Sequence, residues 1–272
     1  MQNKIRLSGL KAEQYIHPQE RQMKTIKEYP MIIEGLNRLN DWNVSLVRQI
    51  TLGRHMEVTE ETAPKLIHII EDVCKILDYP EVPRVYICHQ AAQTLCCAGT
   101  DKMQVTISDY IIEKFDEDML YYAFGNLISM FKAGHVKLVT VCSMLFTTPQ
   151  TIALELPLRA YLRAADLSSD RGGLLACQNF SAAVRVILWN AGIPLAEMKD
   201  KTEEEIIALS ENFIQAVDLS SPDWLTICGM DWKKWNMDSM PTAYKLKELL
   251  AWYRMDYSKL LEQWKKMGDD LQ

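Results

Sequence analysis

Two carboxylates stand one helical turn apart in the segment RAADLSSDRGG and are the clearest candidates for chemistry in the sequence. Asp166 and Asp170 are four residues apart, so a helix places them on one face, with Arg163 and Arg171 nearby. Such a pair can contribute to a metal site or belong to an ordinary ion-paired network. We favour the network, because only the spacing of the two acids supports a metal site.

The histidines add little to a metal site. Four of them are isolated, with no HxH, HxxxH or HxxE spacing: His17, His55, His68 and His89. His135, in the step KAGH, is a further candidate ligand, but we expect it to make a structural hydrogen bond. The candidate metal ligands are therefore Asp166, Asp170 and His135, all weak, and we expect no cofactor.

The seven cysteines indicate reduced thiols. Their number is odd, no two are spaced as CxxC, and most lie in apolar segments, which favours buried free thiols over disulfides or a zinc ribbon. A nucleophilic Cys142 or Cys177 would need a base supplied by the fold.

Composition indicates an ordinary globular protein. The chain has 272 residues, 48% of them hydrophobic, and a formal net charge of −6, which gives no electrostatic footprint for nucleic acid. The longest apolar run, residues 138–146, is far shorter than the roughly 20 residues of a spanning helix, and no apolar leader begins the sequence. We expect a cytoplasmic protein that does not insert into membranes.

Helical patterns dominate the chain. Apolar residues recur at helical spacing from Thr59 to Tyr79, and the acids of 116–118 open a second helical run that continues to Phe146. We predict further helices over 17–40 (divided by Pro30), 158–178 (broken or tightened near Gly172-Gly173), 200–219 and 241–266. Segments 82–90 and 103–110 are rich in β-branched and aromatic residues and predict strands. The expected fold class is α+β, mostly helical.

Seven segments carry a resemblance to a known family: HPQER (17–21), AGTD (98–101), MQVTISDYII (103–112), FDEDMLYYAFGN (115–126), KAGHV (132–136), RAADLSSDRGGLLACQ (163–178) and MPTAYKLKELLAWYRMDY (240–257). In their order the sequence resembles the HtpX-like zinc metallopeptidases, in particular their soluble bacterial branch. The resemblance implies one zincin-like domain over 1–272, with helices packed on a small sheet. It comprises an N-terminal helical extension (1–58), a core (59–180) and a C-terminal helical part (181–272).

The resemblance implies a metal site whose chemical groups are lost. Such enzymes carry HExxH, in which two imidazoles bind Zn²⁺ and the glutamate polarises water. Asn126 falls at the first His, Leu127 at the Glu and Met130 at the second His. Asp166 falls at the acidic ligand of the next helix, and Met240 represents a further His near the C-terminus. An amide, an aliphatic chain and a thioether cannot hold zinc and activate water.

The resemblance also implies a peptide-binding strand just before the AGTD turn. The corresponding segment is QTLCCAGT, and with the strand that follows it we expect a groove formed by Thr94, Leu95, Cys96, Cys97 and Val105. Strand pairing uses main-chain groups, so the changed side chains need not abolish it. A second concentration of Trp and Met over 224–240 is core packing or another adaptable surface.

We therefore expect a catalytically inactive metallopeptidase homologue that binds a peptide or partner protein. The alternative is an active peptidase with a metal site remodelled from Asp166, Asp170 and His135, which would need zinc, or a hydrolase that uses a thiol.

Overall fold

The computed structural model describes residues 4–22, 49, 53–89, 95–99, 102–136, 152–217 and 240–269. This part of the chain is mostly helical with a small mixed sheet, which confirms the α+β class. Its longer helices are α3 (Pro64–Ile76), α5 (Glu117–Lys132), α7 (Ile152–Cys177), α8 (Phe180–Asn190), α9 (Glu203–Gln215), α12 (Thr242–Trp252) and α13 (Ser258–Asp269). Shorter ones are α1 (Pro18–Gln22) and α4 (Asp109–Lys114), with 3-10 turns at Ala12–Gln14 and Leu195–Glu197 and a π-helical turn at Tyr253–Tyr257. No helix within these ranges combines the length and apolar content needed to cross a membrane.

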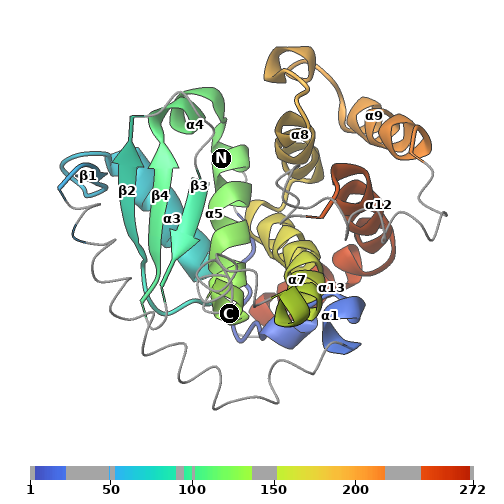
Figure 1. Ribbon diagram of the computed structural model, residues 1–272, viewed down its shortest axis with the longest axis horizontal. Helices are drawn as coiled ribbons and strands as arrows, with labels where there is room; N and C mark the ends of the chain where they lie inside the picture. The colour runs from blue at the N-terminus through green and yellow to red at the C-terminus, as the bar shows by residue number, and fades with distance from the viewer. Residues whose placement is uncertain are drawn as a thin grey trace.

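The sheet lies at one side of the molecule in Figure 1, and most of the helices lie at the other. Its described strands are β1 (Met56–Glu57), β2 (Arg84–Cys88), β3 (Leu95–Ala98) and β4 (Gln104–Ser108), in the order β1-β2-β4-β3. β2 and β4 run parallel, whereas β3 pairs antiparallel with β4 so that Leu95 stands opposite Ile107. β3 is therefore an edge strand, and its outer side is not paired with any described strand.

Helix α5 lies between the sheet and helices α7 and α8 (Figure 1), and it contacts both of them and α3. It begins where Asp116 caps its first turn by accepting a hydrogen bond from the Met119 amide. It is buried along most of its length, and one cluster of buried apolar side chains runs from Leu7 to Trp264. Described residues of all three predicted parts of the chain thus contribute to a common core.

Three predicted helix boundaries are wrong. The helix expected from Thr59 starts at Pro64, because Thr59 and Thr62 form a hydrogen-bonded turn instead and proline suits the first helical position. The helical run from residue 116 is interrupted after Lys132, where Gly134 adopts a left-handed φ of +80°. The break expected near Gly172-Gly173 is absent, since α7 is continuous through both glycines.

The glycines of α5 and α7 allow the two helices to approach closely. A Cβ placed on Gly125 would lie 2.2 Å from the Ala176 Cβ, and one on Gly172 would lie 2.0 Å from the Ser129 Oγ. Neither gap admits a methyl group, so the absent side chains set the distance between these helices.

We expect Gly125→Ala to destabilise the protein by about 1–3 kcal/mol, because the added methyl group overpacks this contact. Helix propensity alone would give the opposite sign, a gain of about 1 kcal/mol. Urea unfolding measures the change. Ala251→Gly, at an exposed position of α12, reports the propensity effect without the packing effect, and a stabilised Gly125→Ala variant would contradict the close contact.

Candidate functional site

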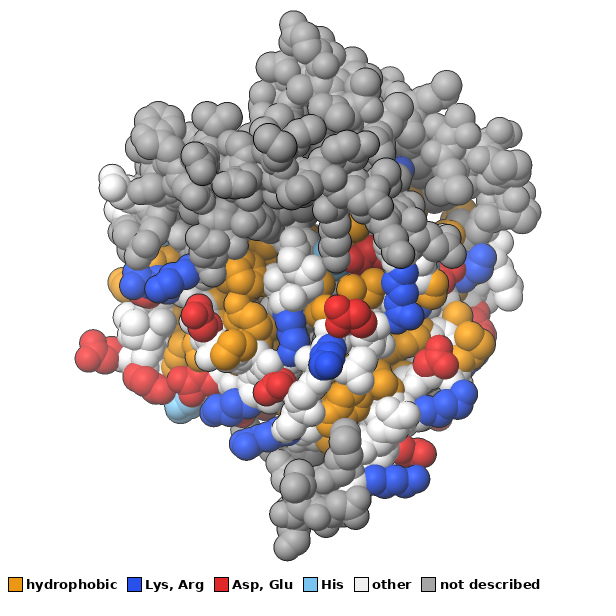
Figure 2. Space-filling model, turned by 90° about the horizontal axis from the view of Figure 1, so that it is seen from below, with side chains coloured by type: hydrophobic (Ala, Val, Ile, Leu, Met, Phe, Trp, Pro, Cys, Tyr) orange, Lys and Arg blue, Asp and Glu red, His pale blue; other side chains and the backbone are white. Residues whose placement is uncertain are grey.

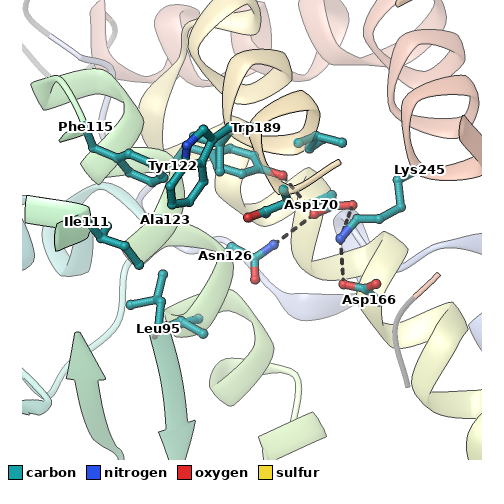
Figure 3. Close-up of a pocket in the computed structure, with 14 residues that line it drawn as sticks. Leu95, Ile111, Phe115, Tyr122, Ala123, Asn126, Asp166, Asp170, Trp189 and Lys245 are labelled. Atoms are coloured by element: carbon teal, nitrogen blue, oxygen red, sulfur yellow. Dashed lines mark hydrogen bonds and ion pairs between the residues drawn. The ribbon is translucent and has the colours of Figure 1, made fainter. Parts of the chain in front are cut away.

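A pocket of about 180 Å³ is lined by residues of the edge strand β3 and of α4, α5, α7, α8 and α12. Its lining residues are Leu95, Ile111, Phe115, Tyr122, Ala123, Asn126, Leu127, Asp166, Asp170, Val186, Ile187, Trp189, Asn190 and Lys245. Figure 3 shows that Leu95, Ile111, Phe115 and Trp189 gather on one side of the cluster, while Asp166, Asp170 and Lys245 lie on the other. The pocket thus has an apolar side and a charged side.

The charged side is built around the ammonium group of Lys245, which reaches from α12 to two acids of α7. Its Nζ lies 2.9 Å from Asp166 Oδ1 and 3.2 Å from Asp170 Oδ2. Because Asp166 and Asp170 are one turn apart, a single cation between them pairs with both. The Asp170 side chain is 2% exposed, so this is a largely buried ion-pair cluster.

Helix α5 completes the surroundings of Asp170 with two neutral donors. The hydroxyl of Tyr122 donates to Asp170 Oδ1 at 2.8 Å, and the Asn126 amide donates to the same oxygen at 3.0 Å. Asp166 accepts a further hydrogen bond, from the Met240 amide to Oδ2 at 2.9 Å. The fold therefore brings together three positions that the resemblance assigned to a metal site: Asn126, Asp166 and Met240.

Burial and charge act against each other in this cluster. Burial raises the pKa of Asp170 to about 7 and Asp166 adds to the rise, although Lys245 and the Tyr122 hydroxyl oppose it. Burial by itself would lower the pKa of Lys245, but the two carboxylates outweigh it and raise that pKa above its usual range. Lys245 is therefore a permanent ammonium, and it is not a candidate amine nucleophile.

Leu127 and Met130, at the other two positions of the lost HExxH pattern, have apolar side chains that add no polar contact to this cluster. Leu127 lines the pocket beside Asn126 and is 8% exposed. Met130 is partly buried one turn further along α5 and does not line the pocket.

The expected groove residues divide between the two faces of the sheet. Leu95 lines the pocket, and Cys97 and the fully buried Val105 lie on the same face, packed in or against the core. Cys96 points to the opposite face and is exposed, because successive strand residues alternate. Thr94 lies outside the described residues, as do Cys142 and the Trp- and Met-rich segment up to residue 239.

His135 belongs to a separate buried cluster. Its Nε2 lies 2.7 Å from Glu20 Oε1, and Glu20 also accepts hydrogen bonds from the hydroxyls of Tyr161 and Ser168. This arrangement joins α1 to α7 and to the end of α5. His135 is thus engaged with Glu20, away from the two acids with which a remodelled metal site would combine it.

The residues at the cluster do not fit a zinc ion. Zinc sites in enzymes use three protein ligands drawn from His, Cys, Asp and Glu, and the ranges described here contain no group of three such side chains that could hold a metal. Both acids at the site already direct an oxygen to the Lys245 ammonium group, so a zinc ion bound between them would have to displace that group.

The described thiols are also poor nucleophiles. Cys177 is fully buried, its one S–H lies within hydrogen-bonding distance of two backbone carbonyls, and burial raises its pKa to about 12. Only the thiolate attacks, so this thiol is inert at neutral pH. Cys96 is exposed, but burial of its surroundings still raises its pKa above the usual value.

The sequence did not identify Lys245 and Tyr122 as partners of Asp170. These two residues and Asn126 make the polar contacts to its carboxylate. Lys245 precedes Leu249 by four residues and Trp252 by seven, so helical spacing places it on the buried face of α12, where a lysine needs an acidic partner. Tyr122 precedes Asn126 by four residues in α5, so both side chains lie on one face of the helix and can reach the same acceptor. Arg171, one of the two arginines that the sequence places near the acids, faces the ring of Trp252, 5.2 Å away.

Comparison with models of protein families, with curated proteins and with solved structures finds no match for this chain. The site has therefore to be interpreted from its own geometry.

We expect Lys245→Met to destabilise the protein by about 3–5 kcal/mol, because it leaves the buried Asp170 and the partly buried Asp166 without a cation. Adding Asp170→Asn should recover part of the loss, since it removes one of the uncompensated charges. Urea unfolding of the single and double variants measures both effects.

Lys247→Met is the matched control, because Lys247 is exposed on the same helix and should change stability by less than about 0.5 kcal/mol. Equal losses at 245 and 247, or no recovery in the double variant, would show that the ion pairs contribute little.

Proposed function

We propose that this protein is a catalytically inactive relative of the HtpX-like metallopeptidases that binds a peptide or a partner protein beside strand β3. The observation that carries the proposal is the Lys245 ammonium group, paired with Asp166 and Asp170 where the resemblance implies a metal ion. Both acids keep a cation next to them, but that cation belongs to the chain itself.

The remaining groups cannot perform metal-assisted hydrolysis. A lysine ammonium has no open coordination position, so it cannot bind a water molecule as a ligand and lower its pKa as zinc does. Leu127 offers no proton acceptor at the position of the general base, and such a base typically contributes about 10²–10⁴ in rate. The cluster therefore supports the packing of α7, α5 and α12 without offering an activated nucleophile.

The surroundings of the pocket favour binding of an extended chain. β3 is an edge strand with one side free of any described strand, so its main chain can pair with a peptide in the manner of an added strand. Leu95 of this strand lines the pocket, together with Phe115 and Trp189. A peptide lying along β3 would thus have an apolar pocket within reach of one of its side chains.

We expect the purified protein to contain no stoichiometric zinc and to cleave no peptide, and a combined Asn126→His, Leu127→Glu and Met130→His variant to take up about one zinc ion per chain. Adding Lys245→Gln should strengthen the uptake, because it frees Asp166 to act as a ligand. Elemental analysis after dialysis measures the metal.

Two results would count against this proposal. Stoichiometric zinc in the unaltered protein, with cleavage that a chelator abolishes, would establish an active peptidase with a remodelled site. Failure of the restored variants to take up zinc, while they remain folded, would show that the scaffold does not have metallopeptidase geometry.

For binding, we expect selection from random peptides displayed on phage to yield ligands whose affinity falls at least about 10-fold with Leu95→Asn, because a polar amide would enter the apolar pocket. Cys96→Ser is the control on the same strand, since its side chain points to the opposite face. Titration calorimetry measures both. Unchanged binding by the Leu95 variant would place the ligand elsewhere.

A further inference from the structure

The pocket beside β3 has an uncompensated negative charge at its polar end. Asp166 and Asp170 contribute two carboxylates, and Lys245 contributes one ammonium group. Among the described residues, the remaining polar side-chain groups of the lining are the hydroxyl of Tyr122, the indole N–H of Trp189 and the amides of Asn126 and Asn190, which are uncharged near neutral pH. The lining therefore has a surplus of one negative charge when both acids are ionised.

One carboxylate oxygen of this cluster has a single partner. Asp170 Oδ1 accepts from Tyr122 and Asn126, whereas Oδ2 has the Lys245 ammonium group at 3.2 Å as its one partner among the described residues. A carboxylate oxygen has room for two donors, and leaving such a site empty in a buried place is unfavourable. Asp170 is one of the residues that line the pocket.

The rest of the pocket suits a hydrocarbon stem. Leu95, Phe115 and Trp189 form its apolar side, and the Phe115 and Trp189 rings meet edge to face with centroids 4.8 Å apart. Figure 3 shows these side chains facing the charged cluster across the pocket. A group that satisfies both ends has an unbranched aliphatic chain and a cationic donor at its tip.

We propose that this pocket takes the side chain of a lysine or arginine residue of the bound peptide, with its aliphatic stem against Trp189 and Phe115 and its cationic head at Asp170. This inference rests on the proposed peptide-binding function. A carboxylate ligand would add a third negative charge, and a purely apolar side chain would leave the surplus charge without a partner. Charge complementarity therefore selects a basic residue.

A proton and a cationic ligand would compete for the Asp170 carboxylate. Burial raises the pKa of Asp170 to about 7, so a proton occupies Asp170 in mildly acidic solution and the charge surplus disappears. The groups facing Asp170 are Tyr122 and Asn126 from α5, Asp166 from its own helix and Lys245 from α12, and α8 adds no titratable side chain to the pocket. Affinity for a cation should thus fall as pH decreases through about 7, because the cation and the proton compete.

The test compares blocked peptides Ac-Thr-Val-Xaa-Val-Thr-NH₂ in which Xaa is lysine, norleucine or glutamate. Norleucine keeps the stem of lysine but lacks the ammonium group. At about pH 8.5 we expect calorimetry to give at least about 10-fold tighter binding for the lysine peptide than for norleucine, and weakest binding for glutamate. At about pH 5.5 the preference for lysine should largely vanish.

Two variants localise the preference. Asp170→Asn should abolish the advantage of lysine over norleucine, whereas Glu211→Gln, which removes an acid paired with Arg254 on the surface, should preserve it. The pH comparison uses the unaltered protein and so remains informative if Asp170→Asn fails to fold.

The outcomes separate this inference from the proposed function. Equal binding of all three peptides, or tightest binding of glutamate, would overturn the basic-pocket inference while peptide binding stands. If no peptide binds, pentylammonium and pentanol serve as probes of the pocket alone. Preferential binding of pentylammonium, weakened by Asp170→Asn, would support the cation site and count against peptide binding, and its absence would overturn the inference.

Discussion

The ammonium group of Lys245 is the point on which the arrangement of the helices depends. It joins α12 to α7 through Asp166 and Asp170, and hydrogen bonds from Tyr122 and Asn126 extend the same connection to α5. Each of these contacts is short and directional, so it fixes the rotation of each helix as well as its distance. Apolar packing alone would leave that rotation less well defined.

This polar connection requires that α5 and α7 lie unusually close. The contact at Gly125 and Gly172 leaves no room for a Cβ, and α5 can therefore bring Tyr122 and Asn126 within reach of Asp170. The space-filling view in Figure 2 shows basic and acidic side chains interspersed on the described part of one face, without a large field of either sign. The surplus negative charge of Asp166 and Asp170 over Lys245 is local and largely buried.

Sequence patterns gave the main helices and two strands because burial imposes strong periodicity on them. The boundaries failed where a local hydrogen bond or a neighbouring helix decided the outcome, as at the Thr59–Thr62 turn and at the glycines of α7. At the site, the four-residue spacing of Asp166 and Asp170 predicted that the two acids share one helix face, but it did not identify Lys245 as their partner. Lys245 lies 75 residues beyond Asp170 in the chain, and no local rule connects them. Only the packing of α12 against α7 brings the lysine to the acids.

The energetics of the cluster favour a role beyond structural support. Buried ion pairs are expensive to desolvate, and well-packed apolar residues of similar size are often at least as stabilising, by about 1–4 kcal/mol. A second acid is harder still to justify on stability alone, since burial already raises the pKa of Asp170 to about 7 and so opposes its ionisation. Asp170 instead adds a second carboxylate to the lining of the pocket, where two acids share one ammonium group. If the pocket takes a cationic side chain, as we propose, that cation offsets part of the free energy lost in burying the second carboxylate.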